Sequence, residues 1–341
     1  MSKDGQNQER PSETCSIRSN DVLEHGRQLR GWRLECVQLS AGAFDGITCE
    51  LQLDHFQIIR ERTNQALIKR GASWPDSIVL SLPLDASGQG WLGGHQLPAG
   101  ATLLSDGNNL PELRTPTRLD LICVAFSRRW FTIRVIEAGY LRLAEHVWRL
   151  ERFSIPEQHR LALCALLLSI FEEVERQPSI LVHAASREAL EDTLLETLLA
   201  GLAESVLVTL AEDTPRKQLA DQVRYLMLKD PSEAPNLAEI CRRLSISRAH
   251  LQNCFQLSYG VTATQMIRAA RLHGVRSELR DARLSGRQVS IGDVAARWGF
   301  WHWSRFTADY RRQFGELPSV TVRPARLSQS RQFKGGRSDS G

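Results

Sequence analysis

The sequence lacks the cysteine spacing that a disulfide framework or a thiolate metal site requires. Its 341 residues contain seven cysteines, an odd number, and no two of them form a C-x-x-C motif. Disulfide-rich domains and cysteine zinc clusters both depend on close, paired cysteines. We therefore expect reduced and mostly buried thiols, as in a protein of the cytosol.

The sequence also lacks an apolar run long enough to cross a membrane. The longest run, "LALCALLLSIF" at residues 161–171, has 11 residues, whereas a membrane-spanning helix needs about 20. The first 16 residues are polar and contain no apolar segment of the kind found in signal peptides. These absences predict a cytoplasmic protein with no membrane partner.

Patterns typical of catalytic sites are missing as well. A metal-dependent oxygenase built on a β barrel needs a facial triad such as H-x-H or H-x-D/E with a distant histidine, and here His55 and His95 stand alone. Cys164 lies in an apolar segment, which is a poor setting for a nucleophilic thiolate. We expect no catalytic residue, no metal and no required cofactor. A β-barrel metal-dependent enzyme fused to a DNA-binding domain is kept as an alternative.

What the sequence does have is a division of charge between its two ends. Residues 236–341 contain 17 Arg and one Lys against seven Asp and Glu, a net charge of +11. Residues 1–235 therefore carry −7, because the whole chain carries +4. A basic region joined to an acidic one is typical of a polyanion-binding domain attached to a domain with another role.

The periodicity of apolar residues divides the chain into a strand-rich and a helical part. Between residue 31 and about residue 134, a period near two predicts antiparallel strands, at 47–63, 77–84 and 119–127. One slip in the first strand segment fits a bulge or a short turn. From residue 156 the period becomes helical, at 157–176, at 187–210 and from Thr214 onward. The N-terminal half is thus predicted to be a β sandwich or barrel.

An internal duplication lies in the basic region. Residues 236–260 align with residues 290–315 at an offset of 54, and one inserted residue in the turn then changes the offset to 55, so that Leu251 meets Phe306. Each copy predicts a short helix after a Ser or Asn N-cap, a tight turn and a second helix. This is the helix-turn-helix pattern, and two copies are too few for a solenoid.

The second helix of each copy has an outward face suited to DNA. With Leu251 and Phe306 directed inward, small and amide side chains face outward, and these can contact adenine and thymine in the major groove. The residues predicted to face bases are Ala249, Gln252, Asn253, Gln256, Trp303, Ser304, Thr307 and Ala308. The residues predicted to contact phosphates are Arg248, Arg268, Arg271, His302, Arg305, Arg311 and Arg312.

A continuous helix at 267–284 is predicted to join the two copies. It would hold the two reading helices about one DNA turn, roughly 34 Å, apart. Trp298 and Phe300 replace smaller apolar residues of the first copy, so we expect both in the core. Trp301 and Trp303 have no large apolar counterpart there, and both turn packing and groove contact are open for them.

These residues resemble the AraC family of transcription regulators, whose DNA-binding domain is a tandem helix-turn-helix. The resemblance covers about 215–323 and rests on I-x-x-V-A-x-x-x-G-F at 291–300 and F-x-x-x-Y-x-x-x-x-G at 306–315. It implies a sequence-specific transcription regulator of promoter DNA, an activator that responds to a small-molecule effector and works with RNA polymerase. A non-DNA-reading adaptor is the other alternative, which the charge of +11 disfavours.

A second resemblance lies in the N-terminal half. Residues 49–83, with "GQGWLGG" shortly after them, are similar to the sensor half of the ethanolamine-operon regulators of this family. That similarity implies an effector such as an amine, for example ethanolamine, or a cobalamin. An aromatic wall and a charged anchor at strand ends and turns suit a small ligand, and the candidate residues for them are Arg60, Arg62, Trp74 and Trp91.

The predicted fold class is α+β, in five consecutive parts. They are a disordered tail (1–20), a β-rich effector-sensing domain (21–155), a helical dimerisation or linker region (156–212), an all-α C-terminal domain with two helix-turn-helix motifs (213–325) and a second disordered tail (326–341). The two long helices of the linker region are the predicted surface of a homodimer. Packing of these helices within one chain is the alternative.

Overall fold

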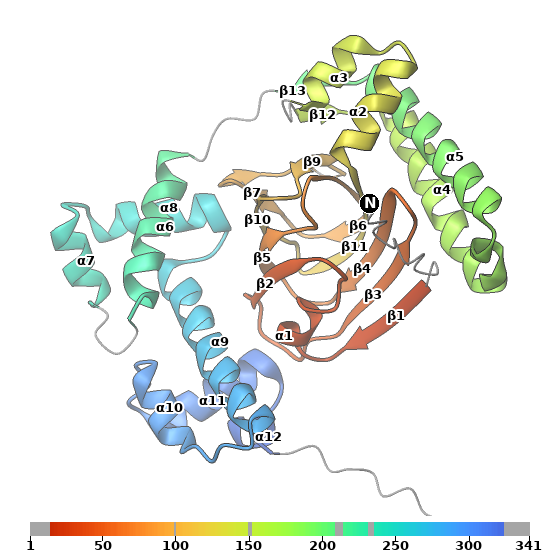
Figure 1. The fold of residues 1–341 in the computed structure, drawn as a ribbon. Helices are drawn as coiled ribbons and strands as arrows, with labels where there is room; N and C mark the ends of the chain where they lie inside the picture. Colours follow the sequence, from red (N-terminus) through yellow and green to blue (C-terminus); the bar gives the residue numbers. More distant parts are fainter. Residues whose placement is uncertain (1–13, 99, 149–151, 209–213, 231–234, 324–341) are drawn as a thin grey trace, which may run out of the picture.

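Two antiparallel β-sheets form the N-terminal half of the molecule (Figure 1). The structure, a computed structural model, describes residues 14–98, 100–148, 152–208, 214–230 and 235–323. The six-stranded sheet has the order β1 (Thr14–Ser19), β3 (Gly46–Gln52), β4 (Phe56–Thr63), β11 (Arg118–Ser127), β6 (Ser77–Ser87) and β9 (Leu103–Asp106). The five-stranded sheet has the order β2 (Arg33–Gln38), β5 (Leu67–Ala72), β10 (Leu110–Arg114), β7 (Trp91–Leu92) and β8 (His95–Gln96). The β-rich N-terminal half predicted from the sequence is confirmed.

The alternation of side chains along β4 explains how the sheets are buried. Ile58 lies on the outer face of the six-stranded sheet, under helices, whereas Ile59 packs in the interior with Leu110 of the other sheet. The predicted slip between β3 and β4 is a short turn, in which the backbone N–H of Leu53 donates to the carbonyl of Phe56 at 2.8 Å. Each strand thus contributes to two separate apolar layers.

Helices cover the outer face of the six-stranded sheet. The elements of this layer are α2 (Arg128–Glu137), α3 (Leu141–Trp148), β12 (Arg152–Ser154), α4 (Glu157–Arg176), the 3-10 helix η1 (Pro178–Val182), α5 (Ala184–Ala203) and β13 (Val206–Val208). Helices α4 and α5 form an antiparallel hairpin (Figure 1). Leu167 of α4 and Leu198 of α5 share one buried cluster with Ile122 of β11. The apolar faces assigned from sequence to a homodimer therefore pack within the chain.

Three predictions of local structure were wrong. Residues 14–19, placed in a disordered tail, form β1, because they pair along their whole length with β3. The strand-rich region ends at Ser127, whose hydroxyl caps α2 by accepting from the N–H of Trp130. The helix predicted at 187–210 ends at Ala203, and the β-branched residues beyond it form β13, which pairs with β12. Residues 1–13 and 324–341 of the predicted tails lie outside the described residues.

The C-terminal half is helical in the described residues. Its helices are α6 (Pro215–Leu228), α7 (Leu237–Arg243), α8 (Arg248–Tyr259), α9 (Ala263–Leu284), α10 (Ile291–Arg297), α11 (Trp303–Phe314) and α12 (Pro318–Thr321). We call α7 with α8 the first helix pair and α10 with α11 the second helix pair. Helix α9 joins them (Figure 1), and its 22 residues correspond to about 33 Å at 1.5 Å per residue.

Both pairs pack their inward side chains against α9. Leu251 is 0% exposed and Phe306 is 1% exposed, as the helical periodicity predicted. Trp298 packs against the second core, and its ring lies so close to Gly274 of α9 that a Cβ there would be 2.2 Å from it. Because glycine has no Cβ, α9 can accept the indole. The prediction that Trp298 and Phe300 belong to the core is confirmed.

The first helix pair is attached to the two β-sheets of the N-terminal half, which we call the barrel, by apolar and charged contacts. Ile68 of β5 belongs to the same buried cluster as Leu251 and Phe255. Glu112 of β10 accepts from Arg224 of α6 at 2.7 Å and from the hydroxyl of Tyr259 at 2.9 Å. Burial raises the pKa of Glu112, but Arg224, Lys217 and the tyrosine hydroxyl together hold it below its usual range.

The second helix pair is attached by a buried polar network. Helix α1 (Val22–His25) follows Asp21, and the carboxylate of Asp21 accepts from Arg276 of α9 at 2.6 Å and pairs with Arg280. The side-chain amide of Gln38 in β2 donates to the carbonyl of Gln313 in α11 at 2.8 Å. All five residues of this network are at most 8% exposed. The barrel therefore contacts both pairs, on the side of α9 that carries Arg276 and Arg280.

Candidate nucleic-acid interface

The two helix pairs share one local geometry. Ser247 caps α8 by accepting from the N–H of His250, and His302 caps α11 by accepting from the N–H of Arg305 at 3.4 Å. The preceding turn contains a left-handed residue in each pair, Ser245 with φ 53° and Gly299 with φ 79°. Two N-caps and two turn residues thus match position by position.

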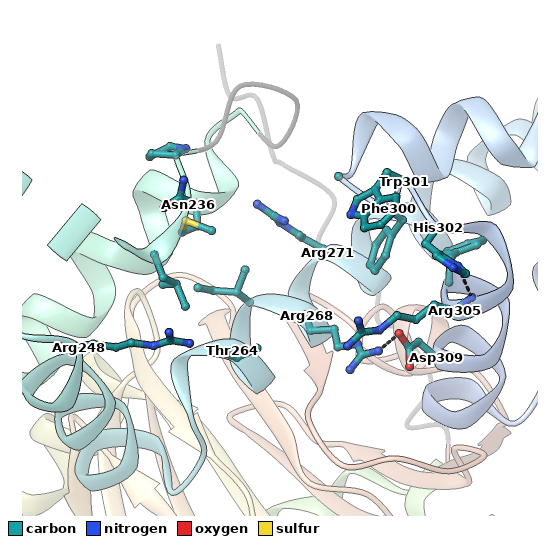
Figure 2. Close-up of a pocket in the computed structure, with 16 residues that line it drawn as sticks. Asn236, Arg248, Thr264, Arg268, Arg271, Phe300, Trp301, His302, Arg305 and Asp309 are labelled. Carbon is teal, nitrogen blue, oxygen red and sulfur yellow. Dashed lines mark hydrogen bonds and ion pairs between the residues drawn. The ribbon is translucent and has the colours of Figure 1, made fainter. Parts of the chain in front are cut away.

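An open cleft of about 680 Å³ lies between the two helix pairs, and Figure 2 shows its lining. Four arginines reach it from three helices: Arg248 from α8, Arg268 and Arg271 from α9, and Arg305 from α11. The residues of α9 that line the cleft lie on a different face from Arg276 and Arg280. The barrel thus occupies one face of α9 and leaves the cleft open on another.

The charge of this cleft is only partly neutralised. Arg268 pairs with Asp309 of α11, and burial together with Arg305 and Arg312 lowers the pKa of its guanidinium. Burial lowers the pKa of Arg271, and its Nε has no hydrogen-bond partner among the described residues. Within those residues, no carboxylate forms an ion pair with Arg248, Arg271 or Arg305. Three guanidinium groups therefore remain available to an anion such as a phosphate group.

Five of the seven predicted phosphate contacts line the cleft: Arg248, Arg268, Arg271, His302 and Arg305. The other two, Arg311 and Arg312, are exposed on α11 outside it. Sequence reasoning missed Asn236 and Thr264, which also line the cleft. The position of Asn236 at a helix N-cap could be predicted from the sequence. Nothing in the sequence indicates that Thr264 faces the same cleft.

The outward faces of α8 and α11 hold the predicted base-facing residues. Those that are exposed are Ala249, Asn253, Gln256, Trp303, Ser304 and Ala308. Thr307 is half-buried and donates its hydroxyl proton to the carbonyl of Trp303. Gln252 is also half-buried, and its Oε1 accepts from the backbone N–H of Ala263 at 3.1 Å, at the start of α9. Its oxygen therefore already has a partner inside the protein.

The barrel interior contains two small cavities that share Ser81, Leu103, Leu113 and Leu121. One has a volume of about 100 Å³ and the other about 70 Å³. The lining is mostly apolar, and the ionisable groups at its edge are cations and a thiol, with Lys69 among them. Lys69 pairs with the buried Glu61, whose carboxylate also accepts from Nε2 of His25 at 2.8 Å.

The four candidate effector residues do not come together. Arg60 pairs with Asp120 at 2.7 Å, and Arg62 is exposed on the same strand. The indole N–H of Trp74 donates to Gln57 at 3.1 Å in the barrel interior. The indole N–H of Trp91 donates to the carbonyl of Leu257 in α8 at 3.0 Å, where the barrel meets the first helix pair. None of the four lines either cavity.

In the described ranges, no cluster of three or more His, Cys, Asp or Glu side chains is placed to hold a metal ion. No described helix has the length and hydropathy to cross a membrane.

Comparisons with known proteins place the match in the helical half. Residues 240–323 match a helix-turn-helix domain family. The "Probable thc operon regulatory protein" of Rhodococcus erythropolis is 26% identical over 162 residues, which are 47% of this chain and 48% of that protein. The chain thus spans about half the length of this curated relative.

Another relative is covered more completely. The "XylDLEGF operon transcriptional activator 2" of Pseudomonas putida is 30% identical over 127 residues, which are 36% of this chain and 80% of that protein. The solved structure of the AraC-like transcriptional activator CuxR is 18% identical, with 83% of this chain and 100% of that chain covered and a TM-score of 0.39. By its matched domain and its relatives, the chain belongs to the AraC family of DNA-binding transcription regulators, which are not enzymes.

Proposed function

We propose that the protein is a sequence-specific regulator that reads promoter DNA with both helix pairs at once. Each pair acts as a helix-turn-helix, and α8 and α11 enter successive segments of the major groove. The observation that carries this proposal is the cleft between them, where four arginines from three helices converge. A phosphodiester backbone crossing between two major-groove segments fits such a cleft.

The length of α9 supports the same arrangement. Its 22 residues span about 33 Å, close to the roughly 34 Å that separates major-groove segments on one face of a duplex. Helix α9 also belongs to both apolar cores, through Met266 in the first and Val275 in the second. Because α9 is packed into a core at each end, it holds α8 and α11 at a fixed distance from each other without a partner subunit.

The proposed roles divide by position. Asn253 and Gln256 on α8, and Ser304 and Ala308 on α11, face the bases, because they are exposed on the sides of these helices that point away from the cores. The cleft arginines contact phosphates, and Arg311 extends that contact along α11. Gln252 has a smaller part in base reading than its neighbours, since its oxygen accepts from Ala263.

Salt-dependent DNA binding tests this function. The full chain is titrated with promoter fragments at several salt concentrations, beside the variants Arg271→Ala and Arg287→Ala. Loss of one phosphate contact reduces the slope of log K against log salt by about one unit, and we expect this for Arg271→Ala. Arg287 is exposed and outside the cleft, so its variant controls for net charge. Absence of binding by the parent protein at low salt would contradict the proposal.

We further propose that the barrel is a sensor for a small effector and that the protein activates transcription as a homodimer with RNA polymerase. The support for the sensor role is two carboxylates of the N-terminal half: Glu112, which accepts from Arg224 of α6 and Tyr259 of α8, and Asp21, which accepts from Arg276 of α9. A change of barrel shape would reach both readers along these contacts. The proposed parts are a sensor (21–155, extended to include β1), a linker (156–212) and a DNA-binding domain (213–325).

The cavities favour a small and mostly apolar effector over an amine or a cobalamin. Cavities of about 100 Å³ and 70 Å³ are far too small for a corrin. Among the described residues, no carboxylate lines these two cavities, and Lys69 and Arg70 border the smaller one. Glu35 instead lines a more open pocket of about 550 Å³ that shares Arg70 with the smaller cavity. A buried ammonium group needs an anionic partner, and the described lining of these two cavities does not provide one.

Thermal unfolding of the full chain with a panel of small apolar compounds, ethanolamine and adenosylcobalamin tests the effector class. A ligand that binds only the folded state raises Tm. We expect a shift with members of the apolar set alone. A shift with ethanolamine or the cobalamin would contradict the cavity argument and restore the amine or cobalamin effector.

A further inference from the structure

Trp301 is the most exposed large apolar side chain among the described residues. Its exposed fraction is 89%, compared with 53% for Trp303. Trp303 packs on Phe306 of its own core, with ring centroids 5.6 Å apart, whereas the one ring contact recorded for Trp301 in the described residues is with the exposed His302. Tryptophan is enriched at binding interfaces, so an exposed indole that packs on no core is a candidate contact for a binding partner.

Trp301 is also the single inserted residue that distinguishes the two turns. Ile246 and Phe300 pack against their respective cores as counterparts, and Ser247 and His302 are the matching N-caps. Ile246 and Ser247 are adjacent in the sequence, whereas Trp301 lies between Phe300 and His302. The inserted residue is therefore Trp301. It contributes little to the packing of its own domain, because most of its surface is in solvent.

The surroundings of Trp301 indicate the chemistry of its partner. The indole lines the cleft together with Arg271, His302 and Arg305, and Figure 2 shows it on the same side of the cleft as Phe300 and His302. An occupant of this cleft must offer anions to the arginines and an apolar surface to the indole. A DNA strand offers both, since phosphates alternate with deoxyribose and with the faces and edges of bases.

We propose that Trp301 is an apolar DNA contact, which packs against sugar and base atoms beside the phosphates held in the cleft. This inference rests on the proposed function and assigns a residue to it. It gives the second helix pair a component of affinity that does not depend on counterion release. The first pair has no counterpart, because Trp301 is inserted and Arg248 occupies the position of Trp303.

The experiment compares three variants of the full chain: Trp301→Ala, Arg271→Ala and Leu284→Ala. Dissociation constants for a promoter fragment are measured by fluorescence anisotropy over a range of salt concentrations. Aromatic contacts to nucleic acid are worth about 1–3 kcal/mol each, so Trp301→Ala is expected to weaken binding by roughly 5- to 160-fold. The weakening should be the same at every salt concentration, whereas Arg271→Ala should change the slope.

Leu284→Ala is the matched control, because Leu284 is 68% exposed in the same domain and does not line the cleft. It should bind as the parent does. An unchanged dissociation constant for Trp301→Ala overturns the inference, and a simultaneous loss of transcription would assign Trp301 to a protein partner instead. If Trp301→Ala binds as the parent does, the proposed function still holds provided that the parent binds DNA and that Arg271→Ala weakens this binding. Failure of the parent to bind DNA refutes both.

Discussion

The two helix pairs have the same buried construction and different exteriors. Both have an N-capped second helix, a left-handed turn residue and an inward Leu or Phe, at Leu251 in the first and Phe306 in the second. Outside, the first presents amides and Arg248, while the second presents Trp301, Trp303 and a group of arginines. The two copies share the buried residues and caps that stabilise the fold, whereas their exposed residues, which could contact a ligand, differ.

The pairs also differ in how the barrel contacts them. The first combines an apolar cluster that includes Ile68 of β5 with the contacts of Glu112 to Arg224 and Tyr259. The second is contacted mainly through polar groups: Gln38 bonds to α11, and Asp21 pairs with the arginines of α9. Apolar contact tolerates changes of charge, but a buried ion pair becomes destabilising once one partner is removed. The second attachment should therefore be the more sensitive to charge and to pH.

The largest effect is expected from Asp21→Ala. This change removes the carboxylate that Arg276 and Arg280 share and leaves them paired with Glu316 and Glu24. We therefore expect the free energy of unfolding in urea to fall by about 3 kcal/mol, the lower end of the range for a broken buried pair. Hydrogen exchange should accelerate in α10 and α11 more than in α7 and α8. Asp45→Ala removes an exposed pair with Arg18 and should change little. Equal acceleration in both helix pairs would remove the distinction between their attachments.

A pH-dependent difference is expected from His273→Gln. The backbone N–H of Gln38 donates to Nε2 of His273 at 2.7 Å, and burial, with a smaller effect of Arg276, lowers the pKa of His273 to about 3. The unfolded imidazole takes up a proton near pH 6.5. A folded pKa below the unfolded one contributes stability above pH 6.5 that is lost as the pH falls toward 3.

The advantage of the parent over His273→Gln should thus shrink by about 1.4 kcal/mol per pH unit between about pH 6 and pH 4. Urea unfolding of both proteins across this range measures it. Burial raises the pKa of Glu191 to about 7, which has the opposite effect in the same range but is common to both proteins. Parallel stability curves would show that His273 is not buried in its neutral form.

An intermediate effect is expected on sequence preference. Asn253→Ala should relax discrimination at one half of the binding site by about 1–3 kcal/mol. Arg311→Ala should weaken binding to all sequences alike, because a phosphate contact carries no sequence information. A library of randomised sites selected with each variant measures both. A preference that changes with Arg311→Ala and not with Asn253→Ala would exchange their roles.

The smallest effect is expected from Ser245→Gly. Ser245 has φ 53° where the second helix pair has Gly299, and a non-glycine residue in this region is strained by roughly 1 kcal/mol. Glycine removes the strain but adds freedom to the unfolded chain, so we expect a small net gain in stability, of at most about 1 kcal/mol. Thermal unfolding checks it. A clear loss of stability would mean that the serine side chain supports the turn.

Features set by neighbours in sequence were predictable, and those set by distant contacts were not. The N-caps Asn236 and Ser290 and the inward Leu251 follow from local spacing, and all are observed. Trp91 was assigned to an effector site, but its indole donates to a residue 166 positions away. Asp21 carried no signal at all, since its arginine partner Arg276 is 255 positions away. Chemistry made by two separate domains cannot be inferred from either segment alone.

Footprinting on a promoter fragment tests most directly whether both helix pairs read DNA at once. Hydroxyl-radical cleavage of DNA bound to the full chain should show two protected patches about one helical turn apart on one face. Asn253→Ala should weaken one patch and Trp301→Ala the other. A single protected patch that only one of these variants affects would show that one helix pair does not contact DNA, and the central claim would then be wrong.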